Sequence, residues 1–134
     1  MEATPTLTDI ACNQAVVIGE LVQSPERKDL PSGAEVVSFS LTVRADGQKT
    51  TSVPLSWFNP PKRVDRWKVG DQIVAVGPVV RRFYQAGGAT GSRTDIDVRH
   101  AESLASTRSR RLLDRAESTL NELAIALDVA LDGT

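Results

Sequence analysis

Apolar and polar side chains alternate from Val37 to Val43, and alternation at a period of two is typical of a β-strand with one buried face. The apolar members are Val37, Phe39, Leu41 and Val43, with Ser38, Ser40 and Thr42 between them. Successive side chains of a strand point to opposite faces. The pattern therefore predicts that the apolar set faces a core and the hydroxyl set faces outward.

Other short segments are rich in apolar and β-branched residues, which favour strands. They are residues 15–22, 50–58, 72–76, 79–84 and 94–99. Glycine, proline, serine and aspartate cluster between them, Gly77-Pro78 interrupts the chain, and residues 62–68 have room for at most two helical turns. Five or six short strands predict an antiparallel barrel or sandwich over residues 13–103, preceded by a flexible leader at 1–12. We expect the core to include Val16, Ile18, Phe39, Leu41, Trp67, Ile73 and either Val74 or Val76.

Beyond residue 103 the period changes, since apolar residues recur every three or four positions. This set is Leu113, Ala116, Leu120, Leu123, Leu127 and Ala130. It predicts an amphipathic helix within residues 104–134, with Ser109 as a candidate start cap and Gly133 as a candidate end. Because an exposed apolar stripe is adhesive, we expect self-association along this helix; docking of a different protein and packing on the chain's own barrel are the alternatives.

The composition of the chain excludes several kinds of binding and catalytic site. The 134 residues include one cysteine, Cys12, and one histidine, His100, which exclude an internal disulfide and leave too few ligands for a structural zinc site. The sequence contains neither a glycine loop suited to phosphate before a helix nor a base placed beside a nucleophile, so we expect no cofactor, no metal and no enzyme activity. The longest apolar run near the N-terminus, residues 15–18, is too short to span a membrane, and cytoplasm is the expected compartment.

The formal charge of −1 hides a division along the chain. Residues 13–100 carry twelve basic and nine acidic side chains, a balance of +3, and each flank carries −2. The expected β domain is therefore the basic part of the molecule.

The order of several short motifs resembles that of bacterial single-stranded DNA-binding protein. These are Asn13-Gln14 before an apolar strand with Gly19, Pro25-Glu26, Leu30-Pro31-Ser32-Gly33, the alternating strand at 37–43, Val69 to Gly77, and Val80-Arg81-Arg82-Phe83-Tyr84. The resemblance covers about residues 13–100. It implies a five-stranded OB-fold barrel, usually in a homo-oligomer, that stacks DNA bases on aromatic rings and holds phosphates in basic grooves.

The chain also departs from that family. Two aromatic platforms are missing near residues 44–48 and 50–52, and the acidic C-terminal tip is replaced by the amphipathic helix. The resemblance nevertheless implies bound single-stranded DNA, a dimer or tetramer, and a role in DNA replication, repair or recombination. The alternative is an OB-fold module that binds DNA weakly and docks a partner protein through its helix.

The resemblance also selects candidate DNA-binding residues. Trp57 lies where the family places an aromatic at the end of the third strand, although strand alternation leaves open that Trp57 is a core residue and Phe58 faces the DNA. Arg81, Arg82 and Tyr84 combine guanidinium groups with a ring on one strand, whereas Phe83 is expected to pack inward. Arg44 and Lys49, in or near a loop, complete the candidate set.

Overall fold

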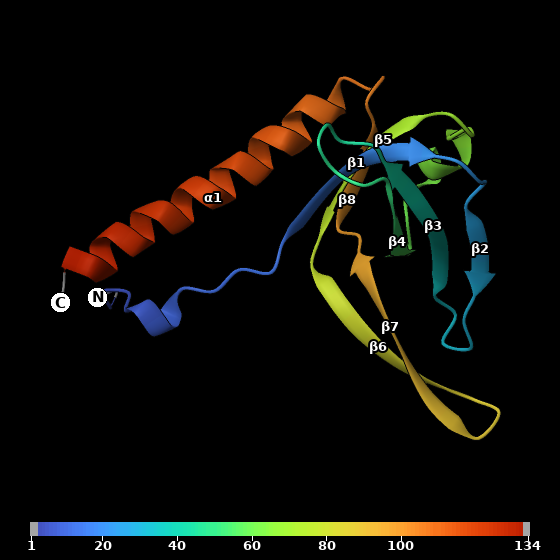
Figure 1. Ribbon diagram of the computed structural model, residues 1–134, viewed down its shortest axis with the longest axis horizontal. Coiled ribbons are helices and arrows are strands. Elements are labelled where there is room, and N and C mark those ends of the chain that lie inside the picture. The colour runs from blue at the N-terminus through green and yellow to red at the C-terminus, as the bar shows by residue number, and fades with distance from the viewer. Residues whose placement is uncertain (1–2, 133–134) are drawn as a thin grey trace.

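The computed structural model describes residues 3–132, which form a curled β-sheet and one long helix (Figure 1). The ends of the predicted leader and of the predicted helix, including the candidate cap Gly133, lie outside these residues. The strands are β1 (Ala15–Leu21), β2 (Glu26–Asp29), β3 (Glu35–Val43), β4 (Thr51–Phe58), β5 (Gln72–Gly77), β6 (Val79–Ala86), β7 (Ala89–Asp97) and β8 (His100–Ser103). The helices are the 3-10 turns η1 (Leu7–Asp9) and η2 (Lys62–Arg66) and the α-helix α1 (Arg108–Asp132).

The strands form one sheet in the order β6-β7-β4-β3-β1-β5-β8, with β2 paired to β3. Neighbours are antiparallel except β4 and β7, which are parallel. This mainly β architecture with one C-terminal helix is consistent with an OB-fold. Strand β2 was missed because its sequence, Glu26-Arg27-Lys28-Asp29, has no apolar residue to mark it.

The predicted closed barrel of five strands was wrong in detail, because the eight strands form an open sheet. Pro78 separates β5 from β6, and two residues separate β7 from β8. Proline has no amide hydrogen to donate to a sheet, so a strand is interrupted there. As a result, β5 pairs with β1 while β7, on the far side of the same hairpin, pairs with β4, and the sheet curls between them.

The first strand was assigned the wrong inward face. Val16 and Ile18 were expected in the core but are 44% and 40% exposed, whereas Ala15, Val17 and Leu21 face inward. Both faces of this strand are apolar, so alternation alone could not choose between them. Gly19 explains the choice, because a Cβ there would lie 2.7 Å from the Thr42 carbonyl oxygen and 3.1 Å from the Leu41 Cβ.

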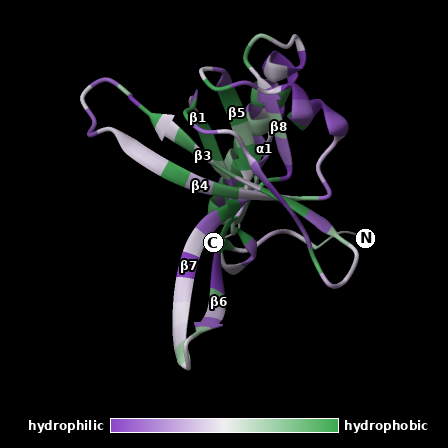
Figure 2. Cartoon of the chain, turned by 90° about the vertical axis from the view of Figure 1, so that its right-hand side faces the viewer, coloured by the Kyte–Doolittle hydropathy of each residue, from purple (hydrophilic) through white to green (hydrophobic). Residues whose placement is uncertain are grey.

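The core lies between β1, β3, β4 and β5, and Figure 2 shows the apolar segments of these strands gathered in the centre of the sheet. Phe39 packs edge-on against Trp67 at 5.4 Å between ring centroids, and Trp57 lies 6.1 Å from Trp67. Leu41 and Ile73 are fully buried beside them. Phe39, Leu41, Ile73 and Trp67 therefore pack in or against the core as expected.

The start of α1 packs on the outer face of β5. Leu112 is buried against Val74 and Val76, and Leu113 packs beside them. The predicted cap at Ser109 was wrong. Ser106 Oγ accepts a hydrogen bond from the backbone N–H of Arg108 at the start of the helix, whereas Ser109 Oγ donates a hydrogen bond to the Ser106 carbonyl. Toward its C-terminal end the helix lies beside η1, from the predicted leader (Figure 1).

Candidate nucleic-acid interface

The long hairpin of β6 and β7 carries most of the candidate residues. Its register pairs Arg82 with Arg93 and Tyr84 with Gly91. Because side chains alternate along a strand, Arg82 and Tyr84 point to one face of the hairpin and Arg81 and Phe83 to the other. The hairpin extends beyond the apolar centre of the sheet, so both of its faces are accessible there (Figure 2).

A buried carboxylate, Asp95, organises the first face. It accepts a hydrogen bond from Ser56 Oγ at 2.6 Å, from Arg82 Nε at 3.1 Å and from Arg93 Nη2 at 3.2 Å. These contacts join β4, β6 and β7 through one side chain, so the two guanidinium groups are held in fixed positions. Sequence reasoning missed Asp95 and Arg93, although their spacing of two residues on a strand would have placed them on one face.

The charge state of Asp95 follows from the same contacts. Burial acts to raise the pKa of Asp95, but hydrogen bonds from Ser56 and Arg93, together with the charge and hydrogen bond of Arg82, outweigh burial and hold that pKa below its usual range. Asp95 is therefore ionised at neutral pH. Its negative charge partly neutralises the positive charges of Arg82 and Arg93.

The end of β4 decides between the two aromatic candidates. Trp57 is 6% exposed in the core, with the Arg63 guanidinium 5.8 Å from its ring centroid, whereas Phe58 is 38% exposed. Expecting the Trp57 ring at the surface was therefore wrong, and the alternative of an inward Trp57 and an outward Phe58 describes the structure. The Arg82 guanidinium lies over the Phe58 ring at 5.0 Å, which brings Phe58 onto the face of Arg82 and Tyr84.

Tyr84 packs over a glycine. A Cβ on Gly91 would lie 2.5 Å from the Tyr84 Cζ, so the ring lies flat against the backbone of β7 while remaining 52% exposed. We call Phe58, Arg82, Tyr84 and Arg93 the aromatic–arginine face. It offers two accessible rings and two positioned guanidinium groups on one side of the sheet.

The second face of the hairpin is more open. Phe83 was expected to pack inward but is 69% exposed, because β6 at this point has passed the edge of the core. The Arg81 guanidinium lies 5.3 Å from the Phe83 ring centroid, and its Nη2 donates to Ser92 Oγ at 3.2 Å. Among the described residues Arg81 forms no ion pair, so no carboxylate offsets its positive charge.

The remaining candidates lie elsewhere. Arg44 and Lys49 flank the turn between β3 and β4, where Val43 pairs with Thr51, whereas Phe58 pairs with Val36 at the opposite end of the same ladder. Seven residue steps separate the two ends, about 23 Å along a strand. Arg44 is also paired with Glu20 at 3.0 Å. The structure therefore does not bring Arg44 and Lys49 together with the aromatic–arginine face.

A groove of about 220 Å³ covers part of the distance between these two ends. It is lined by Ser38, Ser40, Pro54 and Arg93 among others, so two of the three hydroxyl residues that the alternation of β3 predicted to face outward lie along it. Within residues 3–132 no cluster of histidine, cysteine, aspartate and glutamate is suited to hold a metal ion. In the same range no helix is long and apolar enough to cross a membrane.

The chain matches the model of a known protein family. The model of the single-strand binding protein family matches residues 12–104. No match was found among curated proteins. The matched segment contains every strand from β1 to β8, and with them the aromatic–arginine face, and it ends before α1 begins.

Proposed function

The chain belongs to the single-strand binding protein family, and we propose that it binds and protects single-stranded DNA, with little sequence preference, on the aromatic–arginine face. Family membership itself implies single-stranded DNA as the partner and a non-enzymatic role in DNA metabolism. The alternative of a protein-docking module with weak DNA binding is not supported by this match. We further propose that the protein acts in the cytoplasm, in replication, repair or recombination.

The observation that carries the proposal is that Phe58, Arg82 and Tyr84 lie on one face, with the Arg82 guanidinium over the Phe58 ring and both rings exposed. Every base has a flat π-face, so an exposed ring binds bases regardless of sequence, at about 1 to 3 kcal/mol per base. Arg82 and Arg93 supply positive charge beside the rings, where a backbone phosphate would follow a stacked base. Their bonds to Asp95 fix both guanidinium groups before any ligand arrives, which lowers the entropy lost on binding.

Arg81 and Phe83 extend this surface around the hairpin. Because Arg81 has no carboxylate partner in the described part of the chain, it supplies charge that no internal ion pair offsets. Arg44 and Lys49 would meet a strand only after it had crossed the groove over β3 and β4. We therefore rank them as outer contacts of a longer bound strand.

The test is a titration of fluorescently labelled oligo-dT at low salt, with an unlabelled duplex as competitor. We expect saturable binding that the duplex competes for poorly, because paired bases cannot stack on Phe58 and Tyr84. Phe58→Ala and Tyr84→Ala should each weaken binding by about 1 to 3 kcal/mol, and Phe58→Trp should retain it. Wild-type affinity in both alanine variants would remove this face from the proposal.

We also propose that the protein is a homo-oligomer, a dimer or tetramer, and that α1 contributes to its assembly. Leu112 is buried against the sheet and Ala116 is also buried, but Leu120, Ile125 and Leu127 remain at least 40% exposed along the helix. Light scattering on Leu120→Glu/Leu127→Glu should report a lower mass than on Ser118→Glu/Asn121→Glu, which adds the same charge at exposed polar positions. Equal masses would favour a different protein as the helix's partner.

A further inference from the structure

Three arginines form a row on α1, away from the aromatic–arginine face. Arg108, Arg111 and Arg115 are spaced by three and four residues, which places them on one side of the helix. They line a groove of about 310 Å³ together with His100 and Glu102 of β8. We call Arg108, Arg111 and Arg115 the helix arginine row.

The row has no internal counter-charge. Among residues 3–132 none of its three members forms an ion pair, and Glu102, the one acid lining the groove, pairs with Arg63 at 2.9 Å. Arg110 belongs to a different side of the helix, where it pairs with Asp114 at 3.0 Å. The row also lies at the N-terminal end of α1, where the helix dipole already favours negative charge. Three unpaired cations at this position are unfavourable for the isolated protein and favourable for a bound anion.

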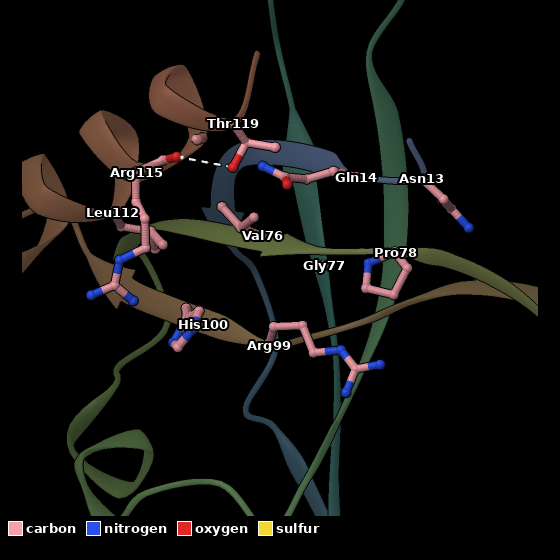
Figure 3. A pocket seen from close by; sticks show the side chains of 11 residues that line it. Asn13, Gln14, Val76, Gly77, Pro78, Arg99, His100, Leu112, Arg115 and Thr119 are labelled. Atoms are coloured by element: carbon pink, nitrogen blue, oxygen red, sulfur yellow. Dashed lines mark hydrogen bonds between the residues drawn. The ribbon is translucent and has the colours of Figure 1, made fainter. Parts of the chain in front are cut away.

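Charged residues lie between the row and the aromatic–arginine face. Arg82 lies 3.9 Å from Asp97, and Asp97 lies 3.5 Å from Arg99. Arg99 and Arg115 then line the same pocket of about 160 Å³ between β5, β8 and the helix. Figure 3 shows Arg115 reaching down from α1 toward the strand segment that carries Arg99 and His100.

We propose that the helix arginine row binds backbone phosphates of a single strand after it has left the aromatic–arginine face. This inference rests on the proposed function, because it assigns a second contact to the same ligand. The helix rise separates the three arginines by about 4.5 and 6 Å along its axis, so they form an extended track suited to a linear polyanion. Arginine fits this ligand because its planar fork donates two parallel hydrogen bonds to one phosphate.

The residues that line this groove include no phenylalanine, tyrosine or tryptophan, and their one ring is the imidazole of His100, so the row contributes charge rather than stacking on a large aromatic side chain. Its contribution to affinity should therefore be independent of base identity and strongly dependent on salt. It should also depend on strand length, since only a strand long enough to pass Arg99 can reach α1.

The experiment compares two full-length variants. Arg108→Gln/Arg111→Gln/Arg115→Gln removes the row, and the control Lys62→Gln/Lys68→Gln/Arg110→Gln removes the same charge from exposed positions, one of them at the same end of the helix. Each variant is titrated with labelled oligo-dT of two lengths, about 8 nucleotides and about 32 nucleotides. The longer length is twice the upper site size of one OB-fold. Affinity is measured over a range of salt concentrations, with light scattering and thermal melting on the same samples.

We expect the row variant to bind the long strand more weakly. The slope of log affinity against log salt concentration should be smaller by about 2, because each of the three lost phosphate contacts accounts for about 0.7. Its affinity for the short strand should equal that of the control, and its melting temperature should not fall. An unchanged long-strand slope would overturn the inference, as would a lower oligomeric mass with unchanged DNA binding, which would assign the row to an acidic segment of a second copy. If the wild-type protein bound neither strand, the proposed function itself would fail.

Discussion

Exchanging the two neighbouring aromatics Trp57 and Phe58 for alanine should separate stability from DNA binding. Trp57 is 6% exposed and packs near Trp67 in the core cluster that also contains Phe39, so it buries nearly all of the 150 to 250 Å² that is typical of a large aromatic. At about 25 cal/mol per Å² this burial is worth roughly 4 to 6 kcal/mol, in line with about 3 to 5 kcal/mol lost in measured truncations of core Phe and Trp. A small domain has about 5 to 15 kcal/mol in total, so Trp57→Ala should be only marginally folded.

Phe58→Ala should show the opposite behaviour. Its ring is 38% exposed and its partner is the Arg82 guanidinium, so truncation should cost less than about 1.5 kcal/mol of unfolding free energy. Binding of oligo-dT should weaken by about 1 to 3 kcal/mol, which is roughly 5- to 150-fold. Urea unfolding and oligo-dT titration on both variants provide the measurements. If Trp57→Ala kept wild-type stability and lost DNA affinity while Phe58→Ala did neither, the assignment of the two faces of β4 would be refuted.

Three further outcomes follow from single contacts. Gly77→Ala should destabilise the fold by about 1 to 3 kcal/mol or more in urea unfolding, because the added Cβ would overlap the Asp97 carbonyl, and a wild-type midpoint would contradict the close approach of β5 and β7. Because the folded protein lowers the pKa of Asp95, the ionised form of Asp95 stabilises the fold. This stabilisation is fully present above the ordinary aspartate pKa of about 4 and is lost as the pH falls through the lower pKa of the folded state. Asp95→Asn should be less stable than the wild type at neutral pH and should lack this acid-dependent loss of stability. Arg81→Gln should reduce the salt slope of DNA binding by about 0.7 without loss of stability, whereas Arg82→Gln should also lower the unfolding midpoint because Asp95 loses a partner; identical behaviour of the two would contradict their different environments.

The segments that sequence predicted best are those in which one physical signal dominates. The alternation over 37–43 correctly gave the strand, and Phe39 and Leu41 in the core, because only one of its faces is apolar. The periodicity after residue 103 gave α1 for the same reason. The inward face of β1 was missed because Val16 and Ile18 are as apolar as their neighbours, and only the contact of Gly19 with β3 decides between them.

The candidate site shows a similar division. Arg82 and Tyr84 could be selected from sequence, since a ring beside arginines on a strand is a local feature, and Phe58 was available as the alternative to Trp57 where the resemblance places an aromatic. Their assembly depends on Asp95, which lies on β7 and meets Ser56 across a parallel pairing with β4. Such a contact between segments far apart in the chain leaves no local pattern. Arg44 and Lys49 were grouped with the site on residue type, and the length of the β3–β4 ladder separates them from it.

The central claim is that single-stranded DNA lies across the aromatic–arginine face, and photocrosslinking tests it most directly. Oligo-dT carrying a photoreactive thymine analogue would be irradiated with the full-length protein, and the crosslinked peptides would be identified by mass spectrometry. Stacking brings a base into contact with an exposed ring, so crosslinks should concentrate on Phe58 and Tyr84, with Phe83, on the other face of β6, as a further exposed ring. Crosslinks confined to the exposed Val16 and Ile18 side of β1, with none on β4 or β6, would contradict the account.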